Sequence, residues 1–526
     1  MLQKKPYRTF YICMLVVLSI IAIRCTNSES KVQTAAVNLT GEELAKKYCT
    51  SCHLYTSPEL LDKKTWQQAV LPGMARALGI QYYSGEPYAD PGYTSNGKEV
   101  KTLPHTNVSV EEWNKIVSFY IKHSPDSVAG QARPPVHQVT NLFHVKRVLL
   151  PSGAYPSATF VKIDPGNHRI YAANGYDSSL DIYNTHGDLL SKNYLHNTVV
   201  DMYFDQPLGN SGVRSGIFTN IGIMNPNDLK TGSVEAFHIS ADGHFDKQEV
   251  LFDSLQRPVQ AIRTDFNNDG LPDYLVCAFG NHEGMLYWME NKGNGKFEPN
   301  IIRPLPGAIK AYIDDINHDG LPDVIALMAQ AEEGIYVFTN KGNGVFETSN
   351  VLLFPPVYGS SYFELTDFNK DGYMDILYTC GDNADYSANV LKPFHGVYIF
   401  LNDGKNNFTQ KYFYPIHGCY KAMAADFDGD GDLDIAAISF FPDYRSQPRE
   451  SFVYLQNKGD FQFDAYTIRE YGEGHWLTMD AADADGDGDI DIVLGSLVPP
   501  VRNISKQFTN ASARKTAVLL LENQTK

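Results

Sequence analysis

The sequence predicts a multidomain protein in which a small all-α domain precedes an all-β domain of the seven-bladed propeller class. Three observations lead to this prediction. The chain has 526 residues, which is too many for one ordinary core. A helical pattern surrounds a cysteine pair near the N-terminal end. Further along, a nine-residue acidic pattern recurs five times, at intervals of 50, 52, 59 and 57 residues.

Composition describes a soluble globular protein. Hydrophobic residues make up 43% of the chain and charged residues 20%. The net charge of −17 argues against a nucleic-acid partner, because a phosphate-binding surface needs clustered lysine and arginine.

Residues 1–25 are predicted to be an export signal. Lys4, Lys5 and Arg8 precede an apolar stretch, Tyr11–Ile23, which is too short to span a bilayer comfortably. The stretch ends at Cys25, and the segment resembles a bacterial lipoprotein signal, which implies lipidation of Cys25 and a membrane anchor. A basic residue replaces the usual small residue before this cysteine, so a plain signal peptide and an uncleaved anchor remain alternatives. In each case the protein is exported, to the periplasm or to the outer membrane or cell surface.

A short helix is predicted to lead directly into a haem-attachment motif. Gly41–Tyr48 has helical character, with Thr40 as its N-cap and Glu43 three residues later. Cys49, Cys52 and His53 follow in the spacing C-x-x-C-H, in which two thiols add to the vinyl groups of a haem and the histidine binds its iron. A redox cysteine pair would need a βαβ context and a zinc site a second ligand pair, and the sequence shows neither.

Residues 36–128 resemble a class I cytochrome c domain, in which a second helix packs across the first. The apolar positions of Val108–Ile121 have the helical spacing of such a closing helix. The resemblance implies one covalent haem c on Cys49 and Cys52, with His53 as an iron ligand. Met74 is the favoured sixth ligand, because a thioether raises the potential of a haem that passes electrons. His105 is the alternative, and an open site is the third possibility.

The acidic pattern predicts calcium loops between strands. Each copy has Asp or Asn at positions 1, 3, 5 and 9 and Gly at position 6, which places alternate oxygens around a hard cation on a tight turn. About five Ca²⁺ ions are therefore expected. The predicted ligands are Asp265, Asn267, Asp269, Asp273, Asp315, Asn317, Asp319, Asp323, Asp367, Asn369, Asp371, Asp375, Asp426, Asp428, Asp430, Asp434, Asp483, Asp485, Asp487 and Asp491.

Residues 138–526 are predicted to form the propeller. Apolar runs and NKGNG turns give four short strands per repeat, and residues 164–265 leave room for two blades that lack the acidic pattern. These repeats resemble the FG-GAP/VCBS family, which implies seven blades. A strand within residues 143–157 is expected to complete the last blade, and residues 129–137 to link the two domains.

Together these features predict an exported haem-binding electron-transfer protein whose calcium-stabilised propeller docks a redox partner or an extracellular or periplasmic ligand. Catalytic motifs such as G-x-S-x-G and H-E-x-x-H are absent from the sequence. One alternative is a propeller oxidoreductase that acts on a carbohydrate or alcohol and uses the haem as electron acceptor. The other is a surface adhesion protein.

Overall fold

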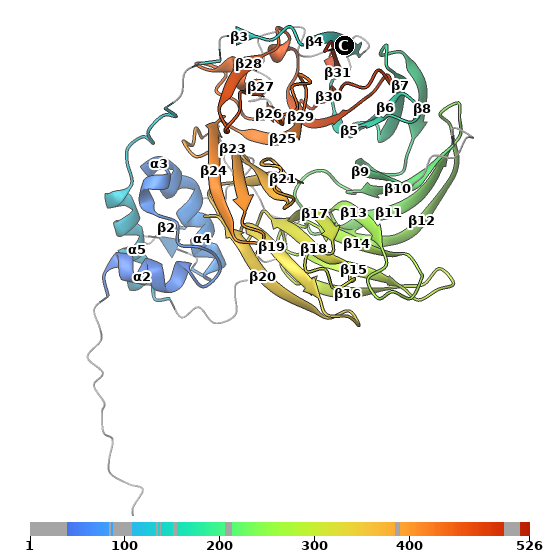
Figure 1. Cartoon of the computed structure of the whole chain (residues 1–526). Helices are drawn as coiled ribbons and strands as arrows, with labels where there is room; N and C mark the ends of the chain where they lie inside the picture. Colours follow the sequence, from blue (N-terminus) through green and yellow to red (C-terminus); the bar gives the residue numbers. More distant parts are fainter. Residues whose placement is uncertain are drawn as a thin grey trace, which may run out of the picture.

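The computed structural model describes residues 39–80, 82–83, 86–87, 108–132, 135–136, 138–150, 155–205, 213–383, 390–498 and 516–525. It has a helical part and seven β-sheets arranged in a ring (Figure 1). Cys25 and His105 lie outside the described residues. Within the described part of the chain, no helix is both long and apolar enough to cross a membrane.

Two capped helices form the frame of the helical part. Helix α2 spans Gly41–Cys49 and helix α5 spans Val110–His123. Each begins with a capping box, in which the N-cap side chain and a glutamate three residues later satisfy free backbone N–H groups. Between them lie η1 (Pro58–Leu60), α3 (Lys63–Thr65), η2 (Trp66–Val70), α4 (Leu71–Ala77) and the short strands β1 (Tyr82–Tyr83) and β2 (Glu86–Pro87).

Helices α2 and α5 touch through a glycine. A Cβ atom on Gly41 would lie 2.3 Å from the carbonyl oxygen of Lys115 and 2.7 Å from the Cβ of Phe119. Any larger side chain would push the helices apart. Trp113, Ile116 and Tyr120 on the inner face of α5 are buried in the core of this part.

Seven blades of four antiparallel strands form the propeller, as predicted. Blade one comprises β5 (Ala158–Asp164), β6 (Arg169–Asn174), β7 (Ser179–Asn184) and β8 (Leu189–Tyr194), and blade two comprises β9 (Val199–Phe204), β10 (Arg214–Asn220), β11 (Lys230–Ile239) and β12 (Phe245–Gln256). Blade three comprises β13 (Pro258–Thr264), β14 (Asp273–Ala278), β15 (Met285–Asn291) and β16 (Phe297–Arg303), and blade four comprises β17 (Ala308–Asp314), β18 (Asp323–Met328), β19 (Gly334–Asn340) and β20 (Phe346–Leu353). Blade five comprises β21 (Ser360–Thr366), β22 (Asp375–Cys380), β23 (Gly396–Asn402) and β24 (Phe408–Pro415), and blade six comprises β25 (Cys419–Ala425), β26 (Asp434–Ser439), β27 (Phe452–Asn457) and β28 (Phe463–Thr467).

The seventh blade joins the two ends of the propeller sequence. Strands β29 (Trp476–Ala482), β30 (Asp491–Ser496) and β31 (Thr516–Asn523) are completed by β4 (Phe143–Leu149), which pairs antiparallel with β31. The expected closure by an N-terminal strand is thereby confirmed. A second N-terminal strand, β3 (Gln138–Val139), adds a parallel fifth strand to blade six beside β28.

The propeller has two unlike faces. Each acidic loop joins the end of an inner strand to the second strand of its blade, so all five loops lie on one face, here called the loop face. The helical part contacts the opposite face. Val357 and Phe394, from connections on that face, belong to the same hydrophobic core as Trp66 and Trp113. Gln131 holds the intervening segment there, because its amide donates to the carbonyl oxygens of Lys392 and His395.

Candidate haem motif and cation loops

The C-x-x-C-H motif lies at the C-terminal end of helix α2. Cys49 is the last residue of the helix and is only 4% exposed, whereas Cys52 and His53 are partly exposed in the following turn. Both cysteines are free thiols. Burial, with a smaller contribution from the neighbouring Cys52, raises the pKa of the Cys49 thiol to about 12. The thiol is therefore neutral at physiological pH, without thiolate character.

His53 is oriented by its own backbone neighbourhood. Its Nδ1 lies 2.8 Å from the carbonyl oxygen of Leu54. A carbonyl can only accept, so Nδ1 carries the proton and Nε2 keeps its lone pair. Metal-binding histidines in proteins commonly have this arrangement, because the second nitrogen fixes the ring and the tautomer.

Met74 lies in helix α4 and packs against the core that contains Cys49. The structure thus brings two of the four described haem candidates, Cys49 and Met74, to one apolar core lined by Trp66 and Tyr120. The donor set of the helical part suits haem c, because it combines a thioether, an imidazole with a free nitrogen and two thiols beside an apolar core.

The acidic loops are closed by their own carboxylates. In the first loop, the Asp265 carboxylate accepts hydrogen bonds from the backbone N–H groups of Asp269 and Gly270 at 3.2 and 2.9 Å. The amide of Asn267 donates to Asp269 at 3.1 Å. The loops that begin at Asp315 and Asp367 repeat these contacts.

The ninth residue of each loop is a buried clamp between strands. The Asp273 carboxylate accepts from the backbone N–H groups of Phe266 at 3.1 Å and Asn291 at 2.8 Å, and its burial raises its pKa to about 6. In the other four loops, the ninth carboxylate also accepts a hydrogen bond from a backbone N–H group of the blade's third strand. These carboxylates belong to Asp323, Asp375, Asp434 and Asp491. These contacts tie each loop to its blade.

The fourth and fifth loops gather carboxylates most closely. Oxygens of Asp426, Asp428 and Asp430 lie within 4.8 Å of one another, and those of Asp483, Asp485 and Asp491 do the same. In the described residues, the other predicted loops form no such group of three, since asparagine holds their third position. Asp487 lies in the fifth loop outside its converging group.

One further carboxylate makes the fifth loop suited to a cation. Both oxygens of Asp489 are buried without a hydrogen-bond partner. Burial raises the pKa of Asp489 to about 6, and the charge of Asp487 adds to this effect. Carboxylates that face one another in this way repel, and a bound divalent ion removes the repulsion. The donor set therefore fits Ca²⁺, which prefers oxygen ligands.

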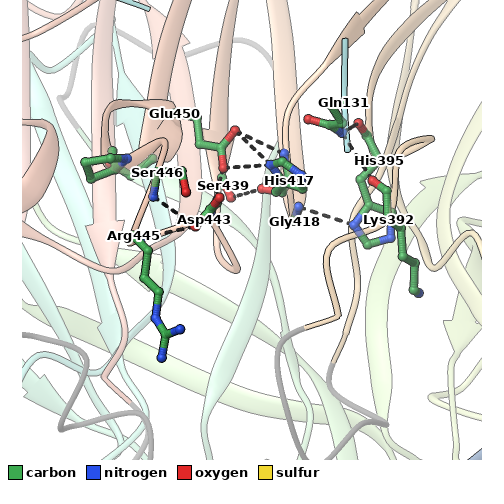
Figure 2. Close-up of polar contacts among 12 residues, drawn as sticks. Gln131, Lys392, His395, His417, Gly418, Ser439, Asp443, Arg445, Ser446 and Glu450 are labelled. Atoms are coloured by element: carbon green, nitrogen blue, oxygen red, sulfur yellow. Dashed lines mark hydrogen bonds and ion pairs between the residues drawn. The ribbon is translucent and has the colours of Figure 1, made fainter. Parts of the chain in front are cut away.

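The sequence did not predict a polar cluster in the strand connections of the propeller near the helical part. Figure 2 shows His417 facing Glu450. The His417 Nδ1 lies 3.1 Å from the Glu450 carboxylate, and both residues are in strand connections on the face opposite the acidic loops. Glu450 also accepts from the backbone N–H of Asp443 at 2.6 Å, and His395 accepts from that of Gly418 at 3.3 Å. These residues come from separate blades and follow no motif, so no sequence signal brings them together.

The fold and its loops define a seven-bladed β-propeller that carries FG-GAP-like repeats. The FG-GAP-like repeat family matches residues 265–326, 315–378 and 385–437, which lie in blades three to six. Cartilage acidic protein 1 of Xenopus tropicalis is 30% identical over 176 residues, which are 30% of this chain and 24% of that protein. The match therefore spans about a quarter of that relative's length.

Two solved structures are similar in part. The Pan2 WD40 domain of Neurospora crassa gives a TM-score of 0.43 at 11% identity, over 74% of this chain and 98% of that chain. The BBS1N chain from a complex with ARL6DN gives 0.42 at 9% identity, over 72% and 97%.

Proposed function

We propose that this protein is an exported electron carrier whose helical part holds one covalent haem c and whose propeller docks a partner or ligand. The observation that carries the proposal is the C-x-x-C-H motif at the end of a helix that another helix crosses at a glycine. Haem, when bound, supplies one-electron transfer.

The residues of the helical part have separate tasks in this proposal. Cys49 and Cys52 hold the group through thioether bonds. His53 presents Nε2 to the iron, and the Leu54 carbonyl keeps the ring in that tautomer. Met74 would be the second iron ligand, and the surrounding apolar side chains would exclude water, which favours the less charged reduced state.

The propeller supplies a rigid surface in this proposal. Its blades are fixed by β4 and by the clamped acidic loops, with about five Ca²⁺ ions as structural braces. The helical part packs directly against the face opposite these loops. A partner that docks on this face therefore meets a surface beside the haem domain, as electron transfer requires.

Haem retention tests the proposal. The full chain is produced in an export host that attaches haem c, and the purified protein is denatured in acid and extracted with organic solvent. Wild type should keep its haem, and Cys49→Ala/Cys52→Ala should carry none. Cys277→Ala, which removes a buried propeller thiol, is the control and should keep it. Haem that extracts freely from the wild type would contradict covalent attachment.

A further inference from the structure

The seventh residue of the acidic loops is uncharged in three blades and acidic in two. The first three loops have Leu271, Leu321 and Tyr373 at this position, whereas the last two have Asp432 and Asp489. The fourth and fifth loops therefore each contain five aspartates within nine residues. Because this extra carboxylate takes the place of an uncharged side chain, it needs a cation or hydrogen-bond donors of its own.

Asp432 has its counter-charge in the preceding blade. The ammonium group of Lys370, the fourth residue of the third loop, lies 3.0 Å from the Asp432 carboxylate. The protein thus places one of its own cations against the seventh residue of the fourth loop.

Asp489 has no such counter-charge. Gly429 is the fourth residue of the preceding loop, so blade six offers no lysine to Asp489. Asp489 is 7% exposed, and both of its carboxylate oxygens are buried without a hydrogen-bond partner. His168 of blade one approaches the loop, but its Nδ1 lies 3.1 Å from the carbonyl oxygen of Ala484. In the part of the chain that the structure describes, no cationic side chain forms an ion pair with a carboxylate of the fifth loop.

The groups that face Asp489 are acidic or already hydrogen-bonded elsewhere. The Asp487 carboxylate accepts from the backbone N–H of Asp489 at 3.1 Å, and the charges of Asp487 and Asp485 act on the Asp489 carboxylate. The backbone N–H of Thr525 is also close, but it donates to the side chain of Asn523 at 3.1 Å. A buried carboxylate among other carboxylates is costly, and a bound cation offsets that cost.

Charge balance indicates the same missing cation. The first two loops contain three aspartates each, so one divalent ion leaves each with a net charge of −1. The fifth loop contains five aspartates, and one divalent ion would leave it at −3. Asp483, Asp485 and Asp491 converge as one group, whereas Asp487 and Asp489 lie outside it. A second divalent ion would bring the fifth loop to −1 as well.

We propose that the fifth loop binds two calcium ions, and that the second is held by the carboxylates of Asp487 and Asp489. Calcium takes oxygen ligands only, and waters complete its shell on the solvent side, where Asp487 is exposed. This inference rests on the calcium braces of the proposed function and does not depend on haem.

The second ion lies where the ring closes. Asp489 is next to Thr525, whose hydroxyl donates to the carbonyl oxygen of Phe427 in blade six at 2.9 Å. Asn523, the last residue of the closing strand β31, donates to the same oxygen at 2.7 Å. The ion therefore braces the C-terminal end of β31 beside blade six.

Counting bound calcium in the full chain tests the inference. Metal-free protein is dialysed against the lowest CaCl₂ concentration that saturates the wild type, and the ions per chain are measured by atomic absorption. Asp489→Asn should bind one ion fewer than the wild type. Asp432→Asn, which removes the carboxylate that Lys370 already neutralises, is the matched control and should bind the wild-type number.

The count separates this inference from the proposed function. Equal numbers of ions in the wild type and Asp489→Asn would overturn the second site and leave the calcium braces standing. A wild type without bound calcium would overturn both.

Melting temperatures give a second readout, which misfolding cannot imitate. In chelator, Asp489→Asn removes a repelling buried charge and should melt at a higher temperature than the wild type. In calcium it should gain less than the wild type, because one ion is missing. Asp432→Asn should show the wild-type gain. A chelated Asp489→Asn that melts below the chelated wild type, or that gains as much from calcium, would contradict the second site.

Discussion

At the residue scale, Met74 is the candidate whose role the helical part constrains least. It is partly buried against the core that holds Cys49, and a core position alone would explain its burial. Met74→Leu keeps the apolar volume, so the free energy of unfolding should fall by less than about 1.5 kcal/mol. If Met74 binds the iron, this variant should lower the reduction potential and abolish the thioether-to-iron charge-transfer band of the ferric protein. If the reduction potential and the charge-transfer band are unchanged, another residue is the sixth ligand, and His105 is the next candidate.

Glu333 provides a pH-dependent test at the same scale. It is 4% exposed and accepts from the backbone N–H and the hydroxyl of Ser360 at 3.1 and 2.8 Å. Burial raises its pKa to about 8; Lys392 opposes the shift and Asp382 adds to it. Because the folded pKa lies above that of an unfolded glutamate, protonated Glu333 stabilises the fold at low pH. This contribution is lost as the pH rises through about 8.

The free energy of unfolding in urea should therefore fall between pH 6 and pH 9, by about 1 kcal/mol or more from this group. Glu333→Gln cannot ionise and should reduce the fall. Glu332→Gln, an exposed neighbour paired with Arg303, is the matched control and should keep the wild-type slope. Identical slopes in all three proteins would show that Glu333 is not the titrating group.

At the scale of elements, the crossing of α2 and α5 sets the geometry of the helical part. Gly41→Ala would place its Cβ against the Lys115 carbonyl, and a backbone atom cannot move aside as a side-chain tip can. We expect a loss of about 1–3 kcal/mol in the free energy of unfolding. Gly73→Ala, in helix α4 with no atom within 4 Å of the added Cβ, should be neutral or stabilising by up to about 1 kcal/mol. Equal effects of the two changes would contradict the close crossing.

Local signals account for the elements that could be predicted from sequence. Thr40 with Glu43 marked the start of α2, and both side chains form the expected capping box. The blades were predictable because the acidic loops and NKGNG turns fix where strands end. Strand β3 gave no such signal, since two residues that pair in parallel with blade six carry no periodicity.

At the scale of the whole molecule, contacts between distant blades limit what the sequence reveals. Ile163 and Asp480 are over 300 residues apart, and the hydrogen bond between the Ile163 backbone N–H and the Asp480 carboxylate forms only because the ring closes through β4 and β31. The interface of the helical part with Val357 and Phe394 has the same origin. Seven blades could be counted along the chain, whereas neighbours across the axis required the structure.

Calcium removal is the test that belongs to the whole molecule. Five acidic loops lie on one face, each clamped by its ninth aspartate to another strand of its blade. A ligand that binds only the folded state at a few hundred-fold to a thousand-fold excess over its dissociation constant stabilises by about 3–4 kcal/mol per site. A typical domain is stable by only about 5–15 kcal/mol, so the loss of several ions should be large.

Chelation should therefore lower the melting temperature of the propeller sharply, and added Ca²⁺ should restore it, while the absorption spectrum of the haem changes little. Asp428→Ala/Asp430→Ala should reproduce part of the loss, because two carboxylates leave one converging group. Asp403→Asn, in an exposed hairpin turn between β23 and β24, is the control and should melt like the wild type in both conditions. A chelated protein that melts at the wild-type temperature would show that the carboxylates act only through their backbone hydrogen bonds.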